Sequence, residues 1–435
     1  MKKIKNILSG NIWLKISFFN SFGVISRVVS GWIINKLIAI YIGPQGTTLS
    51  EQLRNFIQSL EGISTLGIQE GVTKYGAKYE HNSKQLQSFL STAYKIVLIT
   101  SFLTGILIFL FAKKINLILF PDYDFVNIIK ISAIILPIAA INMVLKAILR
   151  GFQQYKKITY IGVSSNIIVT MFAIYLIYKY RLTGALFLVL LTQIAGFVIT
   201  LFYIRKDFQK IFKFSFNNTD KKHYKRLYAY ILMAIISSLV VPVFNILIRN
   251  LIFDYYQGDL GVHAGYWDAV KKISGLFLSL ILPVFSLYYY PQLAKIHTNI
   301  ELKREIKNFL KQIFPYFTLG ILLLYLFRKL ALLIFFSDAY LASEKLFLWQ
   351  LAGDYLRVLS MTLAFLMLAK AHVLKYILLE IGFWVIYYFL SYYLLGKYEL
   401  YGVTLAYFYA YVFYLSGLVL IYKKYLFSKE ELIIK

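Results

Sequence analysis

The 435-residue sequence contains no cysteine and only seven prolines and five histidines. It has 20 acidic residues, compared with 47 lysines and arginines. Without cysteine there are no disulfides and no thiolate metal sites. The few histidines show neither an HExxH motif nor paired spacing, so no metal site is expected. The phosphate-binding pattern GxxxxGK[ST] is missing as well, so the chain is not itself an ATPase and no cofactor is expected.

What the sequence does contain is apolar: 59% of the residues are hydrophobic and the mean hydropathy is +0.66. Apolar runs of about 20 residues recur from end to end, which is typical of an all-α integral membrane protein. A β-barrel would show short alternating segments instead. The basic N-terminus leads into an apolar stretch that is too long for a signal peptide and carries Arg27, so we interpret it as the first membrane helix.

The hydrophobic pattern predicts twelve transmembrane helices in two pseudo-symmetric six-helix bundles. The connection 205–226 is the longest and most basic, and it divides the chain into an N-terminal lobe, 1–204, and a C-terminal lobe, 227–435. Lysine and arginine concentrate in alternate connections, which predicts that both termini are cytoplasmic. This bias explains most of the net charge of +27 without a nucleic-acid partner. The expected spans are 11–41, 46–72, 88–112, 125–149, 156–178, 183–204, 226–250, 263–289, 306–327, 344–369, 373–394 and 399–422.

Charges inside these spans mark a candidate site. One charge at the bilayer centre costs roughly 2.5–3.5 kcal/mol on insertion scales. Arg27, Arg54, Glu61, Asp354 and Arg357 together would cost on the order of 15 kcal/mol, which is comparable to the stability of a whole fold. These side chains must therefore face one another or a hydrated cavity.

The polar spans are the first, second and fourth of each half, whereas the other spans are nearly free of charge. This repeat indicates two related bundles whose polar faces meet in a central cavity. Cations outnumber acids there, as an anionic cargo requires. The predicted substrate-binding residues are Arg27, Arg54, Glu61, Lys74, Lys146, Arg150, Asp268, Lys271, Lys272, Gln350, Asp354 and Arg357.

Each candidate also has a purely structural interpretation. Arg54 and Glu61 could instead form salt bridges between helices that only stabilise the bundle. Asp354 and Arg357 are three residues apart, so they could form a local ion pair on one helix. Lys271 and Lys272 would share the single negative charge of Asp268, which leaves one positive charge for an anion. Snorkelling or anchoring at the cytoplasmic side would account for three further cations, Lys74, Lys146 and Arg150.

Several segments resemble the Wzx flippases of the multidrug/oligosaccharidyl-lipid/polysaccharide exporter superfamily. They are NKLIAIYIGPQG, LRNFIQSLEGISTLGIQEGVTKYGAKY, VLKAILRGF, GYWDAVKKIS and LWQLAGDYLRVLS followed by LAKA. The resemblance implies a V-shaped pair of six-helix lobes in the bacterial inner membrane. It also implies outward flipping of an undecaprenyl-diphosphate-linked oligosaccharide by alternating access. The cargo would be lipid III of enterobacterial common antigen or an O-antigen unit of lipopolysaccharide, with membrane lipids and the polysaccharide polymerase machinery as further partners.

The polar positions of the family are matched by Arg54, Lys74, Lys146, Gln350, Asp354 and Lys370, and Arg357 stands where a lysine is expected. The span 263–289 departs from the family. Asp268, Lys271 and Lys272 replace small or neutral residues there, and Gly275 stands where an acid is expected. These departures concern the sugar specificity rather than the class of transport.

Two other functions stay open at this point. A multidrug antiporter of the same superfamily needs a cavity dominated by acids, because its drugs are cationic. A membrane glycan polymerase or ligase needs large outer loops with a catalytic acid–base cluster, and the connections on that side are brief. The peptidoglycan-precursor flippase is a close relative for which fourteen spans would be expected. We therefore predict a transporter and not an enzyme.

Overall fold

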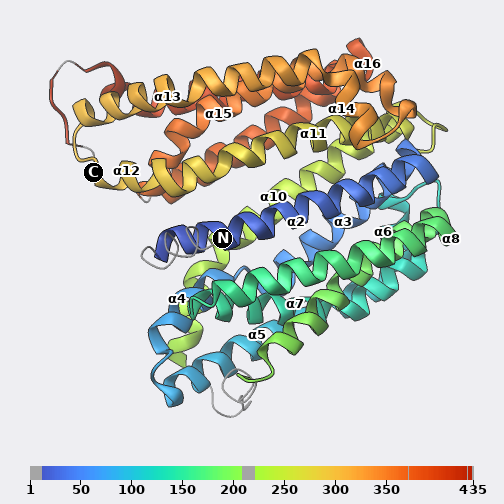
Figure 1. Cartoon of the computed structure of the whole chain (residues 1–435), viewed down its shortest axis with the longest axis horizontal. Helices are drawn as coiled ribbons and strands as arrows, with labels where there is room; N and C mark the ends of the chain where they lie inside the picture. The colour runs from blue at the N-terminus through green and yellow to red at the C-terminus, as the bar shows by residue number, and fades with distance from the viewer. Residues whose placement is uncertain (1–11, 208–220, 371, 429, 434–435) are drawn as a thin grey trace, which may run out of the picture. The chain divides into compact units, whose positions relative to one another are not determined.

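The computed structural model describes residues 12–207, 221–370, 372–428 and 430–433, and within them the chain is helical except for short connections and one isolated bridge between Thr298 and Ile433. The chain divides into two compact units (Figure 1). The first unit comprises Met1–Ile42 and Leu49–Val243, and the second comprises Gly43–Thr48 and Phe244–Lys435.

The helices follow one another with few other elements. The first unit contains α2 (Ile12–Tyr41), α4 (Gln69–Tyr79), α5 (Ser83–Leu110), α6 (Ala112–Leu119), α7 (Val126–Gly151) and α8 (Tyr155–Ile204). The second contains α11 (Val262–Val284), the π-helix η1 (Phe285–Tyr289), α12 (Tyr290–Lys295), α13 (Asn299–Leu326), α14 (Arg328–Phe335), the 3₁₀-helix η2 (Asp338–Leu346), α15 (Phe347–Ala369) and α16 (Val373–Phe427). Two helices belong partly to each unit, α3 (Pro44–Thr65) and α10 (Lys221–Tyr255).

Two of these helices are too long for one crossing. At about 1.5 Å per residue, the 50 residues of α8 would extend about 75 Å, well beyond a hydrocarbon core of about 30 Å. Arg181 interrupts α8 with non-helical angles (φ 50°, ψ −125°), and Glu399 interrupts α16 (φ 53°, ψ −149°). Arg181 falls between two expected spans, and Glu399 is the first residue of the last expected span, so each long helix contains a sharp turn close to an expected boundary.

The all-α membrane fold is confirmed. Eight helices in the described part of the chain are long and apolar enough to cross a membrane, and α8 and α16 are among them. The count of twelve crossings therefore stays a prediction. The lobe boundaries at 204 and 227 and the V-shaped central cavity also stay predictions, and residues 208–220 of the basic linker lie outside the described residues.

The expected single span over 46–72 is wrong. Helix α3 ends at Thr65, and Leu66 and Gly67 take left-handed angles (φ 46° and 60°) before α4 begins. A left-handed pair of residues cannot continue a right-handed helix. The polar stripe of this region therefore ends with α3, and Lys74 belongs to a separate helix.

Two packed groups of apolar side chains from the described residues belong to the core of the first unit. Helices α4, α5, α7 and α8 enclose the larger group, in which Phe89 and Leu145 are fully buried. The smaller group joins α2 to α8 through Ile38, Ala173 and Ala185. Ile38 of this group also lines the polar cavity between α2, α3 and α8, so the contact with α8 forms part of the cavity wall.

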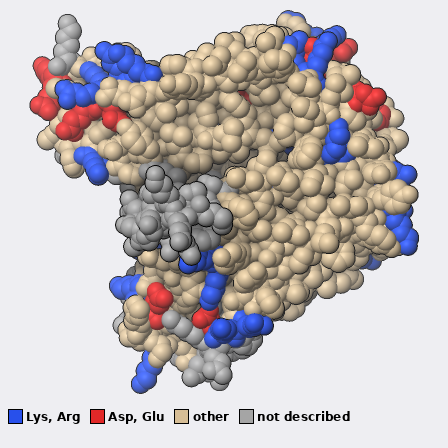
Figure 2. Space-filling model, viewed as in Figure 1, with Lys and Arg blue, Asp and Glu red and all other residues tan. Residues whose placement is uncertain are grey.

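Charged side chains on the visible surface lie mainly towards the ends of the helices, and the surface between them is largely free of Lys, Arg, Asp and Glu (Figure 2). Large apolar side chains such as Leu110, Met171, Leu378 and Leu420 are strongly exposed. A water-soluble protein would bury them, whereas a bilayer solvates them. The surface thus supports the membrane assignment.

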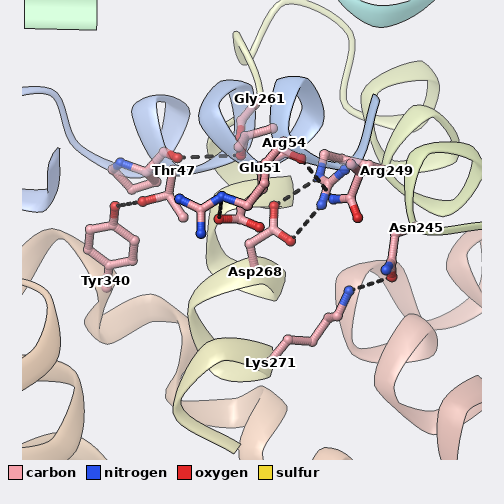
Figure 3. A network of polar contacts seen from close by, with 12 residues as sticks. Thr47, Glu51, Arg54, Asn245, Arg249, Gly261, Asp268, Lys271 and Tyr340 are labelled. Carbon is pink, nitrogen blue, oxygen red and sulfur yellow. Dashed lines mark hydrogen bonds and ion pairs between the residues drawn. The ribbon is translucent and has the colours of Figure 1, made fainter. Parts of the chain in front are cut away.

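The segment Gly43–Thr48 is bound into the second unit by side-chain hydrogen bonds and by one close backbone approach. Thr48 Oγ1 donates to the carbonyl oxygen of Gly261 at 2.7 Å, and Thr47 Oγ1 lies 2.6 Å from Tyr340 Oη (Figure 3). At Gly265 a Cβ atom would lie 2.2 Å from the carbonyl oxygen of Pro44. Only glycine at position 265 allows this approach.

We expect Gly265→Ala to destabilise the protein by about 1–3 kcal/mol, because the added methyl group meets backbone that cannot move aside. The measurement is the midpoint of thermal unfolding of the purified protein in detergent. Gly275→Ala on the same helix is the matched control, because a Cβ there meets nothing within 4 Å. A Gly265→Ala protein that melts no earlier than the control would contradict the packing described here.

Candidate functional site

The first unit contains a polar cavity of about 320 Å³ between α2, α3 and both segments of α8. We call it the basic cavity. Three of the predicted residues, Arg27, Arg54 and Glu61, line it together. The other polar residues of the lining are Ser30, Asn35, Ser50, Gln58, Asn166, Thr192 and Gln193. The prediction that these charged side chains share a hydrated space instead of facing lipid agrees with this geometry.

Hydrogen bonds between helices hold the wall of the basic cavity in place. Ser30 Oγ on α2 lies 2.5 Å from Thr170 Oγ1 on α8, and Asn166 Nδ2 donates to Ser26 Oγ at 3.1 Å. Small and hydroxyl side chains at such contacts let membrane helices approach closely. The side of α2 that carries Arg27 is thereby fixed against α8.

Among the described residues, the ion pair of Arg54 is formed within its own helix. Its Nε lies 3.5 Å from Oε1 of Glu51, one turn earlier on the same helix, and 46% of its side chain is exposed (Figure 3). Exposed ion pairs of this kind contribute about 0–1 kcal/mol. The guanidinium of Arg54 is therefore available to the cavity.

Helix α7 adds two more predicted cations next to this wall. Lys146 lies within electrostatic range of Glu61, Arg27 and Arg150. Arg150 Nη2 also donates to Gln69 Oε1 on α4 at 3.4 Å. Among the predicted residues of the first unit, the cations near the cavity thus outnumber the one carboxylate, Glu61.

Not all of the predicted residues line a cavity, and Lys74 and Lys272 are two that do not. Lys74 is exposed on α4, with its Nζ 5.8 Å from the centre of the Tyr75 ring. Lys272 is half-buried on α11. Neither belongs to the lining of the basic cavity or of the second cavity described below. Their role in substrate binding stays a prediction.

The predicted sharing of Asp268 between Lys271 and Lys272 is wrong. Arg249 on α10 binds Asp268 with two hydrogen bonds, Nε to Oδ2 and Nη2 to Oδ1, both 2.9 Å long (Figure 3). The two side chains are only 1% and 4% exposed. In this buried bidentate pair, the guanidinium of Arg249 neutralises the charge of Asp268. Sequence reasoning missed Arg249, although Asn245 and Arg249 stand one helical turn apart in a predicted span.

Lys271 has other partners. Its Nζ donates to Asn245 Oδ1 at 2.7 Å (Figure 3). The same Nζ lies 3.7 Å from the centre of the Trp267 ring. Trp267 itself is fully buried. A cation over an indole face is stabilised by the ring quadrupole. These contacts hold the side chain of Lys271 against α10 and Trp267 within the second unit.

The residues Gln350, Asp354 and Arg357 lie on one side of α15, as their spacing predicts. Asp354 accepts hydrogen bonds from Ser274 Oγ, from Tyr407 Oη at 2.9 Å and weakly from Gln350 Nε2 at 3.4 Å. Arg357 is hydrogen-bonded to the same Tyr407. The expected local pair of Asp354 and Arg357 is therefore bridged by a tyrosine from α16.

Beyond Tyr407, Arg357 faces a second cavity of about 240 Å³ that lies within the second unit. We call it the aromatic cavity. Glu380 on α16 lines it together with Tyr376, Tyr411 and Tyr414. The sequence interpretation treated 373–394 as nearly free of charge and so missed Glu380. The available signal was one carboxylate in an otherwise apolar span, with aromatic residues at helical spacing around it.

Within the described residues, no group of three or more histidines, aspartates or glutamates is placed to hold a metal ion. The polar groups that line the two cavities are guanidinium, carboxylate, amide and hydroxyl groups. Such groups suit the binding of a charged and hydroxylated ligand.

The fold and the two cavities define a multi-pass membrane protein of the transporter class. Residues 14–297 match the model of the family described as polysaccharide biosynthesis protein, and the chain belongs to this family. It is 28% identical over 419 residues to the lipid III flippase of Escherichia coli (strain K12), covering 94% of this chain and 99% of that protein. The resemblance to oligosaccharide flippases predicted from the sequence is confirmed.

Solved structures of the superfamily share the fold. An inward-facing multidrug resistance transporter of the MATE family superposes with a TM-score of 0.73 at 14% identity, over 94% of this chain and all of that chain. The lipid II flippase MurJ in an inward closed conformation gives 0.70 at 15% identity, over 94% and 87%. At such identities the likeness concerns the fold alone.

Proposed function

We propose that this protein flips an undecaprenyl-diphosphate-linked oligosaccharide, of the lipid III or O-antigen class, from the cytoplasmic to the periplasmic leaflet by alternating access. The observation that carries the proposal is the basic cavity, in which Arg27 and Arg54 face the same space beside Lys146. The similarity to a lipid III flippase over nearly the whole length supports it.

The chemistry of the cargo matches this cavity. A diphosphate presents several anionic oxygens, and guanidinium groups bind such oxygens with short, charge-assisted hydrogen bonds. The polyprenyl tail has no need to leave the hydrocarbon core. Outward movement of an anion is also favoured by an inside-negative potential, by about 2.3 kcal/mol per charge per 100 mV.

Charge also distinguishes this proposal from the drug-antiporter alternative. A cationic drug in the basic cavity would meet Arg27, Arg54 and the field of Lys146, with Glu61 as the facing acid. Repulsion between the positive charges of the drug and of these side chains disfavours a cationic cargo. We further propose that the protein acts as a transporter and not as a glycan polymerase or ligase, and that it delivers its cargo to the polymerase machinery. We place it in the bacterial inner membrane with both termini cytoplasmic.

The test is the lipid content of a strain that lacks this protein. We expect undecaprenyl-diphosphate-linked oligosaccharide to accumulate, inaccessible to a membrane-impermeant label added from outside, and to reach the periplasmic face again when the gene is returned. Efflux of a cationic dye is measured in the same strains. Unchanged lipid accessibility together with lost dye efflux would overturn the proposal in favour of a drug antiporter.

A further inference from the structure

We infer that the aromatic cavity of the second unit binds one neutral sugar residue of the lipid-linked cargo, between the guanidinium of Arg357 and the carboxylate of Glu380. The inference rests on the proposed function and adds to it a separate subsite for the glycan. The groups that line it differ from those of the basic cavity, which the proposed function assigns to the diphosphate.

The size of the aromatic cavity suits one sugar ring. Its volume is about 240 Å³. A pyranose with its hydroxyl groups fills a similar space. Pockets for drug-sized ligands begin at about 300 Å³ and are commonly larger.

The charges in this cavity point to a neutral ligand that both donates and accepts hydrogen bonds. Arg357 and Glu380 lie within electrostatic range of each other across it. A phosphate would be repelled by Glu380, and a cation would be repelled by Arg357. A hydroxyl group can accept from the guanidinium and donate to the carboxylate, so neighbouring hydroxyls of a sugar satisfy both.

The walls supply the aromatic faces that sugars require. Phe383 packs against Tyr411 with ring centres 4.4 Å apart and against Tyr414 at 5.8 Å, so these rings support one another. The C–H face of a pyranose is apolar and packs on aromatic rings, while tyrosine hydroxyls bind its polar edge. Met361, Phe365 and Leu368 complete the apolar part of the lining.

Both charged groups are held from behind. Arg357 is hydrogen-bonded to Tyr407, and Tyr407 Oη in turn donates to Asp354 at 2.9 Å. Glu380 Oε1 accepts from Trp384 Nε1 at 3.3 Å. Functional side chains that are oriented by a second set of contacts keep their geometry when the ligand is absent. Tyr407, Asp354 and Trp384 are positioning residues in this arrangement.

The test compares the binding of two lipids to the purified full-length chain in lipid nanodiscs. The probes are undecaprenyl diphosphate and undecaprenyl diphosphoryl-N-acetylglucosamine, titrated by native mass spectrometry. We expect the wild-type protein to bind the glycosylated lipid at least about tenfold more tightly, as a few charge-assisted hydrogen bonds provide. Glu380→Gln and Tyr414→Phe should each bring the two affinities to within about threefold, with binding of undecaprenyl diphosphate unchanged.

Two matched variants separate this inference from the proposed function. Arg54→Gln should weaken both lipids alike, whereas Tyr392→Phe, an exposed tyrosine on α16, should change neither. A wild-type protein without preference for the glycosylated lipid, or a preference that survives in Glu380→Gln and Tyr414→Phe, would overturn the sugar subsite alone. If neither lipid binds the wild-type protein, the proposed function fails first. Glu380→Gln keeps the shape of the side chain. If this variant does not fold, the Tyr414→Phe variant provides the test.

Discussion

We expect Arg54→Gln to reduce transport of the lipid-linked oligosaccharide by on the order of tenfold to a hundredfold. A hydrogen bond to a charged group contributes about 1.5–3 kcal/mol, and the diphosphate would lose at least one such bond in the basic cavity. Arg54 is half exposed and makes only a weak pair with Glu51, so the fold should tolerate the change. The measurement is the flipping rate of a fluorescent lipid in proteoliposomes, normalised to the amount of inserted protein.

The matched control for this prediction is Lys84→Gln, which removes an exposed cation of the same unit outside the cavity. It should flip at the wild-type rate. Arg54→Lys, which keeps the charge but not the bidentate geometry, should retain an intermediate rate. Full activity of Arg54→Gln, with normal insertion, would remove this residue from the mechanism and weaken the assignment of the basic cavity.

The second large effect concerns stability. We expect Asp268→Ala to destabilise the protein by about 3–5 kcal/mol, because it leaves the Arg249 guanidinium buried without its carboxylate. Such a loss is a large part of the stability of a typical domain. The amount of folded protein in the membrane and the midpoint of thermal unfolding in detergent both report it.

The double variant Arg249→Met with Asp268→Leu distinguishes a structural pair from a substrate contact. Replacing a buried ion pair with apolar side chains of similar volume is often neutral, so the double variant should recover most of the lost stability. Its flipping rate per molecule should equal that of the wild-type protein. An Asp268→Ala protein that folds normally and still fails to transport would show that Asp268 contacts the cargo after all.

Much of the basic cavity could be predicted from the sequence. The reason is energetic: a charge costs several kcal/mol in lipid, so Arg27, Arg54 and Glu61 in apolar runs had to face one shared polar space. The spacing of Gln350, Asp354 and Arg357 likewise places them on one side of a helix, because it matches the helical repeat. The free-energy cost of exposing a charge to lipid thus leaves few possible orientations for these side chains.

The partners of these charges could not be predicted in the same way. Asp268 stands three and four residues from two lysines, yet it binds Arg249, which lies 19 residues earlier on another helix. Tyr407 joins Asp354 to Arg357 from 53 residues away. Spacing along one helix says which residues share a side, but the choice among nearby partners depends on how neighbouring helices pack.

The sequence alone therefore determined that this is a helical membrane protein of the oligosaccharide-exporter kind, and that its intramembrane charges turn inward. Hydropathy and the cost of burying charge act on single segments, so they can be read without tertiary contacts. Only the tertiary structure decided that Asp268 belongs to a buried ion pair and that Glu380 lines a second cavity. Both depend on which helices become neighbours, and that is settled by the fit of whole surfaces rather than by any one span.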